Sequence, residues 1–166
     1  MKKHRSLQGD VFGVRLADGS MRCFQYIARD MTQLNSNVIR VFHEVYQPDE
    51  PVDVQRVTSG RIDFHVHVFL NVGVKLGFWH WVGRAKPPER VDVLFRDSED
   101  YGDPSVKVST QWYVWQVNAP MRKIGALVPK YQESEIGIVV PPHEVVHRIQ
   151  HGRYEFSYPR YEPYIN

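Results

Sequence analysis

The stretch DVFGVRLADGSMRCFQYIA, residues 10–28, indicates the fold class of this 166-residue chain. Apolar side chains alternate with others along residues 10–16 and again along residues 21–28, which is the period of a β-strand with one buried face. Between these segments stands Asp18-Gly19, and Asp-Gly is a strong short-range signal for a hairpin turn. The stretch therefore predicts two antiparallel strands joined by a tight turn.

The same alternation continues along the chain and indicates further strands. The segments with this pattern are residues 37–46, 61–82, 90–95, 109–117 and 122–127. Residues 61–82 are long enough for one long strand or for two strands broken near Gly73 or Gly77. We expect strands over about a third or more of the chain, above the usual 20–25%.

One segment, PPHEVVHRIQHG at residues 141–152, has the features of a helix. Prolines suit the first helical turn, and Glu144 near the start, with basic residues near the end, complements the helix dipole. Val145 and Ile149 share one face, and Gly152 can end the helix in a left-handed conformation. We therefore predict an α+β fold that is mostly antiparallel β, a curved sheet or partly open barrel with one C-terminal helix.

The length fits a single domain covering residues 1–166, with a core at about residues 7–152. The C-terminal stretch RYEFSYPRYEPYIN, residues 153–166, is rich in aromatic side chains. Pro159 and Pro163 oppose both a helix and a central strand. We therefore expect this tail to be an extended segment at the edge of the fold.

Charge and composition favour a soluble cytoplasmic protein. The formal net charge is +2, and the basic residues are spread along the chain, so no nucleic-acid footprint stands out. The single cysteine, Cys23, cannot form an internal disulfide and fits a buried structural position. The basic N-terminus lacks the apolar run of about 7–15 residues found in secretory signals. No run approaches the roughly 18 apolar residues of a membrane span.

The stretch DFHVHVF, residues 63–69, is the candidate for a metal site. His65 and His67 would share one strand face with Asp63, but three ligands on a straight strand would spread over about 13 Å. A site would need another ligand, such as His43 or Glu44, from a neighbouring strand. We expect a polar outer sheet face and no cofactor; a metal-dependent enzyme using His65 and His67 is the alternative. The alternate side chains, expected in the core, are those of Phe64, Val66 and Val68.

No catalytic set is visible elsewhere in the sequence. The chain lacks a G-x-S-x-G elbow, a phosphate-binding glycine loop and a C-x-x-C motif. His147 and His151 have the spacing of zinc ligands on a helix, but Arg148 replaces the glutamate that follows the first histidine in H-E-x-x-H enzymes. We therefore expect a protein without enzymatic activity.

An aromatic and basic tract offers candidate binding residues. Tryptophan and arginine are enriched at interface hot spots, so Trp79, Trp81 and Arg84 are the predicted partner-binding residues. The same two tryptophans beside Arg84, Lys86 and Arg90 could instead stack and pair with single-stranded nucleic acid, which we do not expect at this low net charge. A buried aromatic strand followed by a charged loop would account for the same residues. We expect Trp79 to be largely buried.

Two landmarks together resemble a known family. The first is LQGDVFGVRLADGSMRCFQYI, residues 7–27, with Gly9-Asp10-Val11-Phe12 ahead of the Asp-Gly turn. The second is GFWHWVGRAKPP, residues 77–88, with a tryptophan, a Val-Gly pair and a proline-bearing turn. These motifs resemble the Immunity protein 26 family of bacterial polymorphic-toxin systems, and the late helical segment is similar to its closing helix. The resemblance covers about residues 7–152.

The resemblance implies an intracellular protein that binds and neutralises a partner toxin without catalysis of its own. The composition also favours a binding protein, since no catalytic motif is visible and tryptophan, tyrosine and arginine are abundant. A net charge of +2 makes the chain a poor mimic of phosphate, so a nuclease blocked by charge mimicry is not the expected partner.

Overall fold

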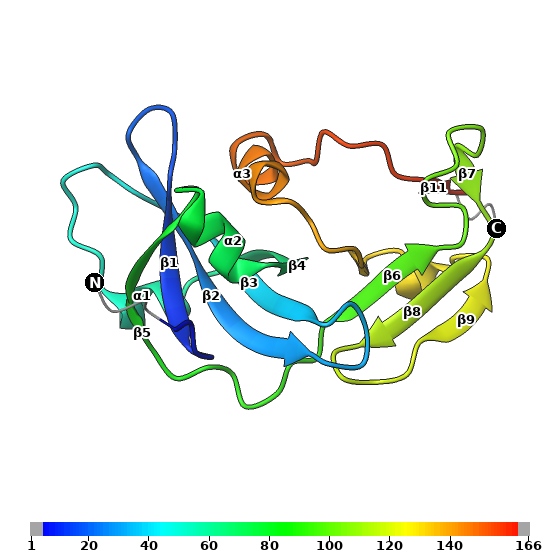
Figure 1. Cartoon of the computed structure of the whole chain (residues 1–166), viewed down its shortest axis with the longest axis horizontal. Coiled ribbons are helices and arrows are strands. Elements are labelled where there is room, and N and C mark those ends of the chain that lie inside the picture. Colours follow the sequence, from blue (N-terminus) through cyan, green and yellow to red (C-terminus); the bar gives the residue numbers. More distant parts are fainter. Residues whose placement is uncertain (1–4, 163–166) are drawn as a thin grey trace.

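A computed structural model describes residues 5–162, which form three β-sheets and several short helices (Figure 1). Strands make up 38% of the described residues, above the usual 20–25%. Most strand pairs are antiparallel, and the sheets do not close into a barrel. The predicted α+β class, a curved and mostly antiparallel β-structure with one C-terminal helix, is therefore confirmed.

The largest sheet has five strands in the order β4-β3-β2-β1-β5, with every neighbouring pair antiparallel. The predicted hairpin at residues 10–28 is confirmed, because Arg15 of β1 pairs with Met21 of β2. The first and last strands of the order lie at opposite edges, which leaves the sheet open. The strands are β1 Asp10–Arg15, β2 Met21–Asp30, β3 Ser36–Tyr46, β4 Ile62–Val68 and β5 His80–Arg84.

A four-stranded sheet, order β10-β6-β8-β9, lies beside the first, to the right in Figure 1. A third, two-stranded sheet pairs β11 with β7. Residues 135–140 link the two larger sheets, because β10 pairs with β6 while Val139 forms a bridge with His67 of β4. The strands are β6 Leu94–Ser98, β7 Val108–Ser109, β8 Trp112–Gln116, β9 Arg122–Gly125, β10 Glu135–Ile136 and β11 Arg160–Tyr161.

The late helix is confirmed at the predicted place, α3 Pro142–His151. Gly152 ends it with a φ of 78°, the left-handed conformation expected from the sequence. Two further short helices, α1 Val54–Thr58 and α2 Leu70–Lys75, and a 3₁₀ turn at Pro129–Tyr131 were not predicted. Within residues 5–162 no helix is long and apolar enough to cross a membrane.

Of the two arrangements expected for residues 61–82, the structure has the second: two strands with a break that contains Gly73 and Gly77. The helix within that break was not predicted. β4 ends at Val68 and β5 begins at His80, and α2 lies between them. Apolar residues alternate from Leu70 to Leu76 as they would in a strand, but of these only Leu70 is buried. The exposed ones are Val72, Val74 and Leu76.

The strand predicted at residues 90–95 begins only at Leu94. Residues 85–93 instead form an irregular connection that includes Pro87 and Pro88, and a proline has no N–H for a sheet ladder. Two valines of this connection, Val91 and Val93, pack against buried residues between the two larger sheets. The segment therefore connects the two sheets by apolar packing rather than by strand pairing.

The two faces of the five-stranded sheet are covered differently. One face carries the main core, which includes Phe12, Phe24 and Phe64 and packs against α2 and α3. The other face carries two separate apolar clusters, one under α1 and one against the four-stranded sheet. Between these clusters the cross-strand row is polar, with Gln25 next to Arg40 and Arg40 next to His65.

The tail is extended over residues 153–162 and runs from α3 toward the two-stranded sheet (Figure 1). Within it, Arg160–Tyr161 form β11, which pairs with β7 in the two-stranded sheet. The tail also contributes to the core, because three of its aromatic side chains pack against the main cluster. These are Tyr154, Phe156 and Tyr158. Pro163 lies outside the described residues.

Candidate functional site

A buried carboxylate brings two of the predicted binding residues together. Asp10, at the start of β1, is 0% exposed. Its Oδ1 accepts a hydrogen bond from Arg84 Nε at 2.7 Å and another from Trp81 Nε1 at 3.1 Å. Its Oδ2 accepts the backbone N–H of Leu7 at 2.8 Å. We call Asp10, Trp81 and Arg84 the Asp10 cluster.

A β-bulge explains how Trp81 and Arg84 reach the same carboxylate. Residues three apart on a regular strand point to opposite faces. On β5, however, Arg84 lies opposite Asp10 and Trp81 lies opposite Phe12, so Val82 is an extra residue in the ladder. Asp10 and Phe12 share a face of β1, and the bulge therefore places both β5 side chains on that face.

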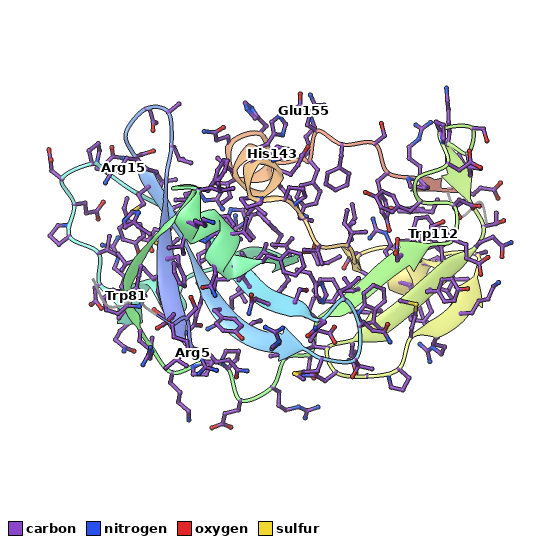
Figure 2. The ribbon with its side chains drawn as sticks, viewed as in Figure 1. Arg5, Arg15, Trp81, Trp112, His143 and Glu155 are labelled. Carbon is purple, nitrogen blue, oxygen red and sulfur yellow. The ribbon has the colours of Figure 1, made fainter. Side chains whose placement is uncertain are left out.

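The two side chains of this cluster are held in place and still reachable. Trp81 is 47% exposed, and the Arg84 side chain is 45% exposed. Figure 2 shows Trp81 beside β5, at the edge of the five-stranded sheet. A side chain that is already ordered loses little conformational entropy when it binds. The cluster therefore presents an aromatic ring and a cation in a fixed arrangement.

Gly9 allows the backbone of Ala85 to lie close to the start of β1, next to this cluster. Its φ is +96°, and a Cβ at this position would lie 2.4 Å from the carbonyl oxygen of Ala85. Ala85 N donates to Gly9 O at 3.0 Å, which holds the residue after Arg84 against the start of β1. The Gly9-Asp10 pair was a landmark of the sequence, but nothing in its spacing revealed that Asp10 would hold Trp81 and Arg84.

The third predicted residue, Trp79, lies elsewhere. It is 2% exposed, its Nε1 donates to the carbonyl of Leu70 at 2.9 Å, and Phe24 meets its ring edge-on at 5.2 Å. The expectation that Trp79 is buried is confirmed. Its side chain belongs to the core, so it offers no surface to a partner and does not extend the Asp10 cluster.

The cations of the nucleic-acid alternative are each paired with a carboxylate. Lys86 Nζ lies 3.0 Å from Glu89, and Arg90 Nη2 lies 3.5 Å from Asp92. Arg84 is paired with a carboxylate too, as part of the Asp10 cluster. This local pairing leaves little net positive charge to attract phosphate groups.

His65 and His67 do lie on the same face of β4, as the alternation predicts, and Phe64, Val66 and Val68 are buried on the other. The prediction of a polar outer face was wrong for His67, which is 0% exposed. The four-stranded sheet covers this end of the strand, and the His67 ring lies 4.2 Å from that of Phe95.

A buried aspartate partners His67. Asp30 Oδ2 lies 3.1 Å from His67 Nε2 and also accepts Trp115 Nε1 at 3.2 Å. Burial lowers the pKa of His67 below its usual value, although Asp30 acts in the opposite direction. Burial would raise the pKa of Asp30, but hydrogen bonds from Gln33 N, His67 and Asn118 N lower it overall. The pair therefore contains a neutral imidazole and a carboxylate, and His67 Nδ1 has no partner among the described residues.

His65 has a different environment. It is half-buried and lines a cavity, and its pKa is lowered to about 4 by burial and by the nearby charges of Arg40 and Arg148. Within residues 5–162 no three His, Cys, Asp or Glu side chains are grouped so that they could hold a metal ion. Cys23 is buried, and burial with the nearby Glu44 raises its pKa to about 12, which makes it a poor nucleophile.

Comparisons with protein-family models, with curated proteins and with solved structures found no match for this chain. The resemblance to the Immunity protein 26 family therefore stays a prediction from the sequence motifs. The Asp10 cluster and the polar row of Gln25, Arg40 and His65 lie on opposite faces of the five-stranded sheet.

Proposed function

We propose that this chain is a non-catalytic, intracellular protein-binding module, an immunity protein that neutralises a cognate bacterial toxin. The observation that supports this most is the Asp10 cluster, in which a buried carboxylate holds Trp81 and Arg84 on the exposed edge strand. The sequence motifs that resemble the Immunity protein 26 family point in the same direction, and Gly9-Asp10 is one of them.

The chemistry of the cluster suits a protein partner. Tryptophan and arginine are the residue types that most often carry the binding energy of an interface. Leu7, whose backbone N–H is bound to the same carboxylate, adds an apolar side chain that is itself exposed. A partner that covers these side chains would bury a ring and an aliphatic group and would pair an acidic group with Arg84.

The partner class follows from charge. Electrostatic complementarity sets which partners a surface attracts. A chain with a formal net charge of +2 does not offer the acidic surface that imitates nucleic acid. The proposed toxin is therefore one that is blocked through contact with the Asp10 cluster rather than through phosphate mimicry.

Co-expression with the product of the adjacent upstream reading frame tests the proposal. That product should be toxic alone, and this chain should bind it and restore growth. Trp81→Ala and Arg84→Ala should each weaken binding by about 30-fold or more, the range of interface hot spots. Lys123→Ala, on β9, removes an exposed cation away from the cluster and should leave affinity unchanged.

Arg84→Ala leaves the buried Asp10 without one partner, so each variant needs a circular-dichroism check that it is folded. The proposal is wrong if the neighbouring product is neither toxic nor bound. If the product is bound equally well by both variants, the interface lies away from the Asp10 cluster.

A further inference from the structure

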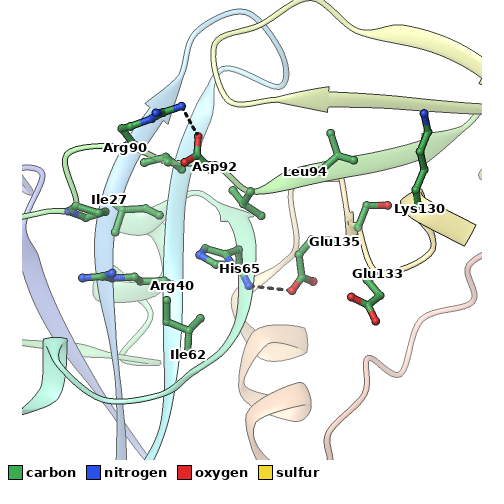
Figure 3. A pocket seen from close by; sticks show the side chains of 14 residues that line it. Ile27, Arg40, Ile62, His65, Arg90, Asp92, Leu94, Lys130, Glu133 and Glu135 are labelled. Atoms are coloured by element: carbon green, nitrogen blue, oxygen red, sulfur yellow. Dashed lines mark hydrogen bonds and ion pairs between the residues drawn. The ribbon is translucent and has the colours of Figure 1, made fainter.

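A cavity of about 490 Å³ opens on the face of the five-stranded sheet opposite the main core (Figure 3). It lies where the polar row of that face meets the irregular connection at residues 85–93 and the segment before β10. Its volume falls within the roughly 300–1,000 Å³ of small-molecule sites. Side chains on its walls include Ile27, Arg40, His65, Val91, Leu94 and Glu135.

Arg40 is fixed in the wall by a buried amide. Its Nε and Nη2 donate to Gln25 Oε1 at 3.1 and 2.8 Å. Gln25 is fully buried, and its Nε2 donates to the carbonyl oxygens of Gly9 and Ala85 at 3.2 and 3.1 Å. These bonds fix the amide orientation, so the guanidinium group stays in one place. The edge of the guanidinium that ends in Nη1 is not used by Gln25.

The charge of Arg40 lacks a counter-ion, whereas the inner carboxylate of the cavity has one. Glu135 pairs with Arg148 at 3.1 Å and accepts the backbone N–H of His65 at 3.1 Å. Among the described residues no carboxylate lies within ion-pair distance of Arg40. Burial accordingly lowers the Arg40 pKa, because the charged form has lost water. An anion entering the cavity would restore the missing charge.

The charges at the rim cancel one another. Asp92 is paired with Arg90 at the mouth, where Figure 3 draws the contact. Lys130 and Glu133 are both exposed and opposite in sign. The inner wall therefore decides which charge the cavity prefers in a ligand. This wall contains the fixed guanidinium of Arg40 beside the imidazole of His65.

His65 is the second polar group of the inner wall. It lies directly across the ladder from Arg40, and its ring makes no hydrogen bond with the described residues. Its lowered pKa, about 4, keeps the imidazole neutral near pH 7, so one ring nitrogen carries a proton that it can donate. Arg40 and His65 thus present two kinds of donor to the same space.

We propose that this cavity binds a small organic carboxylic acid, whose carboxylate pairs with Arg40 and His65 and whose apolar body lies against Ile27, Val91 and Leu94. A planar guanidinium matches the two oxygens of a carboxylate better than any other side chain does. The apolar walls favour an aliphatic or aromatic acid over an inorganic anion. This site is independent of the proposed toxin binding and stands or falls without it.

Titration with benzoate, followed by NMR of the His65 ring, tests the inference. Benzoate should shift the His65 signals with saturation and should raise the His65 pKa, because a bound anion stabilises the imidazolium. Benzamide has the same shape without the charge and should have a much weaker effect. Arg40→Gln should weaken benzoate binding by at least about tenfold, since it removes a charge-assisted hydrogen bond.

Lys123→Gln is the control, because Lys123 is an exposed cation on β9 that is paired with Glu99 and does not line the cavity. It should leave benzoate affinity almost unchanged. If Arg40→Gln does not fold, Arg40→Lys keeps a charge without the planar fork and should still bind benzoate more weakly than the unaltered chain. The inference is overturned if benzamide binds as well as benzoate, if the response never saturates, or if the Arg40 variant retains full affinity.

Discussion

His65 and His67 lie two positions apart on β4, on the same face, and yet have opposite surroundings. His67 is covered by the four-stranded sheet, shares a buried hydrogen bond with Asp30 and packs against Phe95. His65 lines an open cavity beside Arg40, and its ring makes no hydrogen bond with a side chain of residues 5–162. The four-stranded sheet therefore covers His67 but not His65.

A histidine pair of this spacing therefore has no fixed structural or functional role. A strand decides only which face the side chains share. The segments packed on that face, here the four-stranded sheet and the connection at residues 85–93, decide whether each imidazole is structural or accessible. For β4 they make His67 part of the core and leave His65 available to a ligand.

The largest expected effect is that of Asp30→Ala. The carboxylate accepts hydrogen bonds from the side chains of His67 and Trp115 and from the backbone of Gln33 and Asn118. Removing it leaves these donors without a partner, and breaking a buried pair of this kind costs about 3–5 kcal/mol. Urea denaturation measures this loss in the free energy of unfolding.

The matched control for that variant is Asp92→Ala, which removes a carboxylate from an exposed ion pair. Its loss should stay below about 0.5 kcal/mol. A loss of less than about 1 kcal/mol for Asp30→Ala would mean that the buried carboxylate, which accepts from His67 of the same sheet and from Trp115 of the four-stranded sheet, does not stabilise the contact between the two sheets.

The second expected effect compares the two histidines directly. His67→Leu keeps a side chain of similar size but removes the Nε2 donor to Asp30, so unfolding should become easier by about 1–3 kcal/mol. His65→Leu removes a half-buried ring without a hydrogen bond and should change stability by no more than about 0.5 kcal/mol. Equal losses in the same denaturation experiment would remove the contrast between the two positions.

The local part of this contrast could be predicted from the sequence. Alternation along residues 63–69 placed His65 and His67 together and Phe64 in the core, and the structure agrees. The prolines and the final glycine of residues 141–152 predicted α3 with its correct end. Features that depend on residues close together in the sequence could therefore be predicted.

The long-range part could not be predicted. Asp30 ends β2, and nothing near it in the chain indicates that His67 and Trp115 will reach it. Asp10 likewise meets Arg84 only because β5 returns to β1 with a bulge. These contacts depend on tertiary packing, for which alternation along one strand carries no signal.

A third prediction concerns pH. Both histidines have folded-state pKa values below 6.5, the ordinary value for histidine, and that of His65 is about 4. Below pH 6.5 the unfolded chain therefore binds more protons at these sites, so stability falls as the pH decreases toward 4. Each histidine contributes at most about 1.4 kcal/mol per pH unit to this slope.

Other groups titrate in the same range. His80 has a lowered pKa and acts in the same direction, whereas Glu135 and Asp97 have raised pKa values and oppose it. The measurement is therefore a difference between chains: the slope of stability against pH should be shallower in His65→Leu than in the unaltered chain. Identical slopes would show that burial does not exclude the proton from His65.

The smallest expected effect is on the pKa of His65 itself. Burial is the largest cause of its low value, and the charges of Arg40 and Arg148 come next. Arg40→Gln removes one of these charges, so NMR titration should find a His65 pKa above about 4 but still below 6.5, because burial and Arg148 remain. The pKa of His67 should not change, since its charged partner is Asp30.

Lys123→Gln, which removes a cation paired with Glu99 on the four-stranded sheet, should leave both values unchanged. If Arg40→Gln moves His67 as much as His65, the two imidazoles share one electrostatic environment, and the boundary between core and cavity does not lie between them.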